Sequence, residues 1–234
     1  MITSRGLAAL ILTILFHTAL SAEYLYKDEV IHNPLFNKTV EKLGSELYEK
    51  TGVSLRLVML KKLPEGLDIN SYELELLKDF NEPTILLTFS ELDSKVDILA
   101  SESSLYKYFN KKQVLSPVAS PVQAFLMSIV YARSIEELKS MLNNTEGTIL
   151  PVLSVKSKPN ELIGKYSAAM YNGYLDIAHQ VATSKGVVLE NDAGNTNKNG
   201  LFIIKFIFYT IIIIAIYMYI KRRLFIRRQK NELQ

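Results

Sequence analysis

The apolar residues in the first half of the chain follow helical and strand periods in turn. Residues 34–50 carry an apolar stripe at spacings of three and four, formed by Phe36, Val40, Leu43 and Leu47. This spacing predicts an amphipathic helix, and Asn33 followed by Pro34 is typical of a helix start. Residues 53–60 (VSLRLVML) and 84–89 (TILLTF) are continuous apolar runs, which predicts two largely buried strands.

Two further elements continue this order of helix and strand. A second helix is expected to begin with Asn70 or Ser71 as its N-cap and to end near Phe80. Residues 96–101 (VDILAS) come after the polar turn 91–95, which predicts a β-hairpin with the preceding strand. The sequence therefore predicts an α/β fold in which helices pack on a mixed β-sheet in helix, sheet and helix layers.

The second half of the chain is richer in helix. Residues 121–142 predict two short helices or one kinked helix, and residues 160–185 predict a long helix that breaks or bends near Gly173. Residues 148–155 (TILPVLSV) predict a further strand, which Pro151 would confine to the edge of the sheet.

The longest apolar run lies close to the C-terminus. Residues 201–220 (LFIIKFIFYTIIIIAIYMYI) predict one C-terminal transmembrane helix, because a helix of this length crosses about 30 Å of hydrocarbon. The basic tail 221–234 is expected to stay in the cytoplasm. The cations expected to anchor the span are Lys205, Lys221, Arg222, Arg223, Arg227 and Arg228. Residues 190–200 (ENDAGNTNKNG) predict a flexible linker before the span.

The first residues, 1–22, have the order of a secretory signal peptide. Arg5 precedes the apolar stretch 6–16, and Ala19 and Ser21 fit the small residues of a cleavage site. An uncleaved N-terminal anchor is the alternative interpretation. Both interpretations place the middle of the chain outside the cytoplasm.

Residues 23–189 are therefore expected to form one exported domain. We expect a single-pass protein of the inner (cytoplasmic) membrane, with this domain in the periplasm and the lipid bilayer as one partner. Residues 23–200 hold 19 Lys and Arg against 23 Asp and Glu, so charge gives no case for nucleic acid as a partner. The chain has no Cys, which excludes disulfides, thiol chemistry and Cys-based metal sites.

The order of these segments resembles the TPM domain, a small α/β module of exported bacterial proteins and of thylakoids. The resembling segments are the first helix, TGVSLRLVML, PEGLDINSYELELLKDF, TILLTFSELDSKVDILAS and the closing KYSAAMYNGYLDIAHQVATSKG. The resemblance covers roughly residues 23–188. It departs from the family after the third strand, where ILASESSLYKYF lacks the family's glycine. The resemblance implies an α/β layer fold in an exported domain, for which a C-terminal span is a common arrangement.

Some TPM relatives are similar to acid phosphatases, which implies clustered carboxylates around a bound divalent cation. The candidates here lie around the hairpin: Glu91, Asp93 and Asp97, with Asp28, Glu29 and Glu102 as neighbours. A cation such as Ca²⁺ or Mg²⁺ needs several oxygen ligands at one point, and three carboxylates could supply them. The same residues are also ordinary components of a solvated turn.

The last predicted helix carries an aromatic stripe and an Asp–His pair. The stripe consists of Tyr166, Met170, Tyr171 and Tyr174. It either packs against the sheet or forms an exposed face that binds a partner. Asp176 and His179 are three residues apart and could pair on one face of the helix.

Two functional hypotheses follow from these patterns. The sequence contains no Gly-x-Ser-x-Gly elbow, Walker loop, dinucleotide fingerprint or His-Glu-x-x-His motif. The first hypothesis is a membrane-anchored binding or assembly module without a catalytic site, which acts on or with a membrane protein complex. The alternative is a metal-assisted phosphatase or other hydrolase that uses the hairpin carboxylates.

Overall fold

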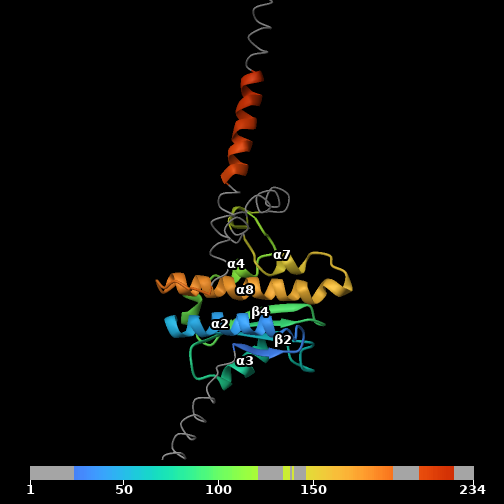
Figure 1. Cartoon of the computed structure of the whole chain (residues 1–234), viewed down its shortest axis with the longest axis vertical. Helices are drawn as coiled ribbons and strands as arrows, with labels where there is room; N and C mark the ends of the chain where they lie inside the picture. Colours follow the sequence, from blue (N-terminus) through green and yellow to red (C-terminus); the bar gives the residue numbers. More distant parts are fainter. Residues whose placement is uncertain (1–23, 121–133, 138, 140–145, 192–205, 224–234) are drawn as a thin grey trace, which may run out of the picture. The chain divides into compact units, whose positions relative to one another are not determined.

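The chain divides into two compact units, Met1–Asn191 and Asp192–Gln234. The computed structural model describes residues 24–120, 134–137, 139, 146–191 and 206–223. The first unit has an α/β fold with a four-stranded mixed sheet, which confirms the fold class expected for the domain (Figure 1). The predicted signal peptide and most of the predicted segment 121–142 lie outside the described residues.

The sheet has the order β1-β2-β3-β4. It consists of β1 (Leu25–Asp28), β2 (Ser54–Leu60), β3 (Thr84–Ser90) and β4 (Lys95–Ala100). The first three strands are parallel, and β4 pairs antiparallel with β3 as the predicted hairpin. All residues of β2 and β3 are buried, as expected for central strands with both faces covered. The short edge strand β1 is an element that the sequence patterns did not predict.

Two long helices, α2 (Pro34–Thr51) and α8 (Leu162–Ser184), cover one face of the sheet (Figure 1). Asn33 caps α2 as predicted, because its side chain accepts hydrogen bonds from the backbone of the first turn. Side chains of this face form the larger core cluster of the described residues, which includes Leu43, Leu47, Leu55, Leu57, Ile85, Leu87, Met170, Tyr174 and Ile177. The predicted apolar stripe of the first helix therefore faces the sheet.

One short helix, α3 (Ile69–Leu76), covers the opposite face and continues into the 3-10 turn η1 (Leu77–Asp79). Its N-cap is Asp68, whose carboxylate accepts a 2.6 Å hydrogen bond from the backbone N–H of Ser71. The predicted cap of Asn70 or Ser71 is wrong by two or three residues. A smaller core cluster lies beneath this helix and consists of Val58, Leu60, Leu63, Tyr72 and Leu86.

The second half of the domain adds short elements around α8. They are η2 (Ser103–Lys107), α4 (Lys111–Val114), α7 (Leu150–Leu153) and η3 (Pro159–Glu161). The prediction of a strand at 148–155 is wrong, because this segment contains α7.

Gly173 explains both the position of α7 and a second correction. The helix α8 runs through Gly173 without interruption, so of the predicted break or bend the break is wrong and the bend stays a prediction. A Cβ at Gly173 would lie 2.3 Å from Cδ1 of Ile149, just before α7. Glycine at this position therefore makes room for the fully buried Ile149 side chain.

Glu46 on α2 holds the end of the domain. Its carboxylate accepts hydrogen bonds from the backbone N–H groups of Glu190 and Asn191, and it pairs with Lys50 at 2.7 Å. Burial raises the pKa of Glu46, but the hydrogen bonds from Lys50, Glu190 and Asn191 outweigh it and lower that pKa to about 2. Two residues of the predicted linker 190–200 are thus attached to the domain, and the rest lie outside the described residues.

Residues 206–223 form a helix in the second unit, and their apolar side chains are exposed. Within the described residues, no helix combines the length and the apolarity that crossing a membrane requires. Lys221, Arg222 and Arg223 lie in the last turn of this helix. The other predicted anchor cations, Lys205, Arg227 and Arg228, lie outside the described residues.

Candidate functional site

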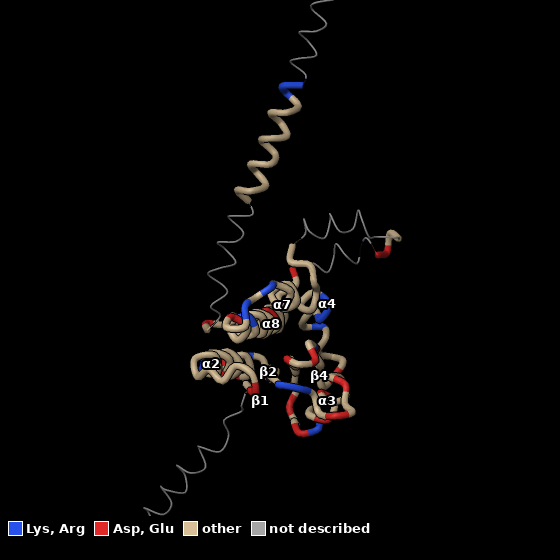
Figure 2. Tube along the Cα trace, turned by 90° about the vertical axis from the view of Figure 1, so that its right-hand side faces the viewer, with Lys and Arg blue, Asp and Glu red and all other residues tan. Residues whose placement is uncertain are grey.

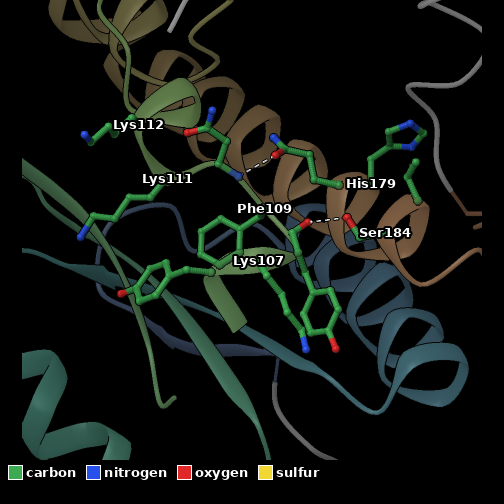
Figure 3. A pocket seen from close by; sticks show the side chains of 11 residues that line it. Lys107, Phe109, Lys111, Lys112, His179 and Ser184 are labelled. Carbon is green, nitrogen blue, oxygen red and sulfur yellow. Dashed lines mark hydrogen bonds between the residues drawn. The ribbon is translucent and has the colours of Figure 1, made fainter. Parts of the chain in front are cut away.

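An open cleft of about 710 Å³ lies between α8 and the segment that joins η2 to α4 (Figure 3). Residues 106–112, from the end of η2 to the start of α4, supply seven of the lining residues, and α8 supplies four from its last turns. The lining residues are Tyr106, Lys107, Tyr108, Phe109, Asn110, Lys111, Lys112, His179, Gln180, Thr183 and Ser184.

Hydrogen bonds attach the two walls of the cleft to each other. The backbone N–H of Asn110 donates to Oε1 of Gln180 at 2.8 Å, and Oγ of Ser184 donates to the carbonyl of Tyr108 at 2.9 Å (Figure 3). Nε2 of Gln180 also donates to Oε1 of Gln113 on α4 at 2.7 Å. Phe109 and Leu105 are buried in the larger core cluster, so the segment is fixed from below as well. These hydrogen bonds and buried side chains therefore fix the shape of the cleft.

The described residues that line the cleft are cationic and aromatic, and none of them is Asp or Glu. Two ammonium groups approach the ring of Tyr108: Nζ of Lys107 lies 4.8 Å and Nζ of Lys185 lies 4.5 Å from its centroid. These distances are in the range of cation–π contacts. Hydrogen bonding to Lys107, and then to Lys185, lowers the pKa of the Tyr108 phenol. This end of the cleft favours negative charge.

Lys111 and Lys112 lie at the other side of the cleft. Figure 3 shows both side chains leaving the cleft on one side, whereas His179 leaves it on the other. Nζ of Lys111 forms an ion pair with Oδ1 of Asp97 on β4 at 2.6 Å. Figure 2 shows the same juxtaposition, with cations at α4 and acidic residues along β4 and α3. Through this ion pair, Lys111 therefore connects the cleft to Asp97 on β4.

A buried carboxyl group, Glu73 of α3, lies beside that ion pair. Glu73 is fully buried, and neither of its carboxyl oxygens has a partner in hydrogen-bonding geometry. Burial raises the pKa of Glu73 to about 8; the Asp97 charge adds to this effect, while Thr88 and Lys111 oppose it. Thr88 and Asp97 are cross-strand neighbours on β3 and β4. Glu73 is therefore a buried carboxyl group with a raised pKa next to the Asp97–Lys111 ion pair.

The three predicted metal ligands have separate partners. Glu91 pairs with Lys61 at 2.6 Å, and Asp97 pairs with Lys111. Asp93 accepts hydrogen bonds from the backbone N–H of Leu63 at 2.7 Å and from Oγ of Ser90 at 2.6 Å. In the part of the chain that the structure describes, no three Asp, Glu or His side chains come together as ligands of a metal ion. The predicted grouping of these carboxylates is therefore not found.

The neighbouring acidic residues also act locally. Asp28 accepts hydrogen bonds from the backbone N–H groups of residues 30–32 and so shapes the turn after β1. Glu29 pairs with Lys27 at 2.8 Å, and Glu102 accepts a 3.0 Å hydrogen bond from Ser104. Asp28, Glu29 and Glu102 therefore make local contacts, which stabilise turns or form an ion pair at the surface.

The predicted aromatic stripe packs inward for the most part. Met170 and Tyr174 are fully buried, and the phenol of Tyr174 donates a 2.8 Å hydrogen bond to the carbonyl of Leu55. Tyr166 and Tyr171 are half-buried against the same core, and the Tyr166 ring lies 5.1 Å from that of Phe89. The interpretation of the stripe as packing is confirmed for Met170 and Tyr174, so the stripe as a whole is not an exposed binding face.

Asp176 and His179 have different surroundings. Asp176 accepts hydrogen bonds from Nε2 of Gln113 and of Gln180, both at 3.1 Å, and so supports the wall of the cleft. His179 belongs to the cleft lining. The predicted Asp–His feature thus lies beside the candidate site, where Asp176 acts through two glutamines.

Glu73 and the cleft lysines are the residues that sequence reasoning missed. A signal for Glu73 was present, because it occupies the apolar stripe of its helix together with Ile69, Tyr72 and Leu76. The cleft itself joins residues that are about seventy positions apart in the chain, as the bond from Asn110 to Gln180 shows. No local pattern could reveal that meeting.

No protein-family model matches this chain, and no curated protein is significantly similar to it. The candidate site is therefore defined by its own geometry: a cationic, aromatic cleft connected through Lys111 to Asp97 and to the buried carboxyl group of Glu73.

Proposed function

We propose that the protein is a membrane-tethered binding module without catalytic activity, and that its cleft binds an extended acidic segment of a membrane protein partner. The observation that carries this proposal is the lining of the cleft, which offers lysines and aromatic rings and no acidic side chain. Acidic chains are recognised by such surfaces through charge, with aromatic rings supplying contact area.

The spacing of the cations favours an extended ligand over a compact anion. Lys107 and Lys185 meet at Tyr108, whereas Lys111 and Lys112 leave the cleft elsewhere (Figure 3). A single phosphate group needs donors that converge on one point. A peptide with several carboxylates can instead contact both groups of lysines along the cleft.

The apolar run 201–220 and the basic residues behind it support the tether. The signal-like residues 1–22 support export, so the proposed site of action is the periplasmic face of a bacterial inner membrane. The resemblance to TPM domains supports the same arrangement. A hydrolase that uses the hairpin carboxylates is not favoured, since those side chains are engaged separately.

Calorimetric titration of the full chain in detergent micelles with hexaglutamate tests the binding function. We expect binding that weakens with salt, and about a fivefold loss of affinity for each of Lys107→Ala and Lys185→Ala, as for the removal of one exposed ion pair. Lys78→Ala is the matched control, because Lys78 is exposed in η1 on the opposite face of the sheet. Equal affinity for hexaglutamate and hexalysine would overturn the proposal.

Cysteine labelling tests the proposed topology. The chain has no Cys, so a single Leu92→Cys or Gln234→Cys substitution creates a unique label site. Leu92 is 62% exposed in the hairpin turn. In intact bacterial spheroplasts, a membrane-impermeant maleimide should label Leu92→Cys at once and Gln234→Cys only after lysis. The reverse order would refute the proposed orientation.

A further inference from the structure

We propose that Lys111 is shared between the cleft and Asp97, so that an acidic ligand captures Lys111 only while Glu73 holds a proton. This inference rests on the proposed function of the cleft and adds its regulation. Under this proposal, ligand binding is coupled to proton uptake at Glu73, a side chain that the ligand does not contact.

Lys111 is the physical link because it belongs to both places. It lines the cleft, and its ammonium lies 2.6 Å from Oδ1 of Asp97. The Lys111 side chain is 31% exposed and that of Asp97 is 17% exposed, so the pair is only partly shielded from solvent. A carboxylate of the ligand must therefore compete with Asp97 for this ammonium.

Glu73 decides how strongly Lys111 is held. The charged groups with the largest influence on its pKa are Asp97 on β4 and Lys111 at the start of α4, with the Thr88 hydroxyl on β3 as a polar neighbour. With its proton, Glu73 is neutral and Asp97 alone attracts Lys111. Without it, the buried Glu73 carboxylate and the partly exposed Asp97 carboxylate both attract Lys111 and disfavour an acidic ligand.

The geometry around Glu73 indicates that the role of this carboxyl group is to bind and release a proton. Both carboxyl oxygens and the Thr88 hydroxyl are buried and lack a hydrogen bond of standard geometry, yet Thr88 and Asp97 lie close enough to shift the pKa of Glu73 through hydrogen bonding. A leucine would fill the same helix position without this cost. Because burial raises the pKa of Glu73 to about 8, its proton is lost just above neutral pH.

These charges determine whether ligand binding takes up or releases a proton at Glu73. When a ligand removes Lys111 from Asp97, a cation that lowers the pKa of Glu73 is withdrawn, so the protonated form gains. Binding therefore takes up protons near pH 8. If only the protonated form releases Lys111, the apparent affinity falls about tenfold between pH 7 and pH 9.

Calorimetric titration of the full chain in micelles with hexaglutamate tests the linkage. Measured at pH 8 in two buffers of different ionisation enthalpy, binding should take up protons in the unmodified protein. The affinity should fall about tenfold from pH 7 to pH 9. All the proteins compared carry Tyr108→Phe, which removes the phenol of the cleft whose pKa is lowered.

Variants separate the linkage from general effects of pH. Glu73→Gln should abolish proton uptake and flatten the pH dependence, while Lys111→Met should lower the affinity at pH 7 and also remove the dependence. Binding without proton uptake in the unmodified protein, or equal pH dependence in Glu73→Gln, would overturn the linkage and leave the binding function standing. No binding at either pH would overturn both.

Discussion

The two faces of the sheet are built for different purposes. The face under α2 and α8 is sealed by apolar side chains from several elements, and the buried phenol of Tyr174 there donates a hydrogen bond to the carbonyl of Leu55. The face under α3 has a smaller apolar cluster and carries charged groups between the layers: Arg56, Glu73 and Asp97. Arg56 there lies 4.2 Å from the centroid of the Phe80 ring and pairs with Glu82 at 2.6 Å.

This difference separates stability from the proposed regulation. A large apolar cluster stabilises a domain in proportion to the area it buries, whereas a buried unpaired carboxyl group opposes folding. The sheet can tolerate Glu73 on one face because the other face supplies most of the stabilisation. The comparison predicts that the two faces respond differently to substitution and to pH.

The largest expected effect comes from truncating one leucine on each face of β3. Leu87 faces α2 and α8, and its neighbour Leu86 faces α3; both are fully buried. We expect Leu87→Ala to lower the free energy of unfolding by about 4 kcal/mol and Leu86→Ala by about 2–3 kcal/mol, because the thinner layer can collapse around the gap. Urea unfolding followed by circular dichroism measures both. A larger loss for Leu86→Ala would reverse the comparison.

The next effect is a gain of stability from Glu73→Gln at alkaline pH. The folded domain keeps the Glu73 proton up to about pH 8, whereas the unfolded chain releases it near 4.5, so stability falls as pH rises between these values. Glutamine has no such titration, and at pH 9 the variant should be more stable by about 2–3 kcal/mol.

The control for this prediction is Glu75→Gln, an exposed position of the same helix. Unfolding free energies at pH 5 and pH 9 are compared for the three proteins. Parallel pH curves for Glu73→Gln and the unmodified protein would show that Glu73 is ionised in the folded state at neutral pH.

A smaller effect is expected for Tyr174→Phe on the sealed face. The substitution keeps the ring and removes the hydroxyl that donates to the buried carbonyl of Leu55. We expect a loss of about 1–2 kcal/mol, since the carbonyl keeps its desolvation cost without this donor. Tyr48→Phe on α2, where the ring is 40% exposed, is the control and should change little. Thermal unfolding of both variants measures the difference.

The smallest effect concerns the attachment of the domain's end. Glu46→Gln should cost about 1 kcal/mol at pH 7, because the carboxylate makes charge-assisted hydrogen bonds to Glu190 and Asn191. With its pKa lowered from 4.5 to about 2, Glu46 contributes this stability above pH 4.5 and loses it as pH falls through about 2. Unfolding at pH 7 and pH 2 checks both values, and an equal cost at the two pH values would contradict the role of the charge.

Elements with local signals were predictable from the sequence. The cap at Asn33, the buried strands and the hairpin follow from side chains that are adjacent in the chain. The predicted strand at 148–155 failed, because a branched apolar run fits any buried surface. Here Ile149 fills the space beside Gly173, which only the packed structure reveals.

The candidate site was less accessible to prediction. The aromatic stripe from Tyr166 to Tyr174 was correctly predicted to lie on one helix. Its spacing is equally compatible with packing against the sheet and with binding a partner, so only the structure reveals that Met170 and Tyr174 are buried. The cleft depends on tertiary contacts between α8 and the segment around Asn110. Glu73 differs, because an acid within an apolar stripe was visible in the sequence, although its partner Asp97 was not.

Chemical-shift mapping of hexaglutamate on the isotope-labelled full chain in micelles tests the central claim most directly. The account predicts that the shifted amide signals belong to residues 106–112 and to His179, Gln180, Thr183 and Ser184, the two walls of the cleft. Shifts confined to α2 or α3, or no shifts at concentrations that saturate calorimetric binding, would contradict the assignment of the cleft as the binding site.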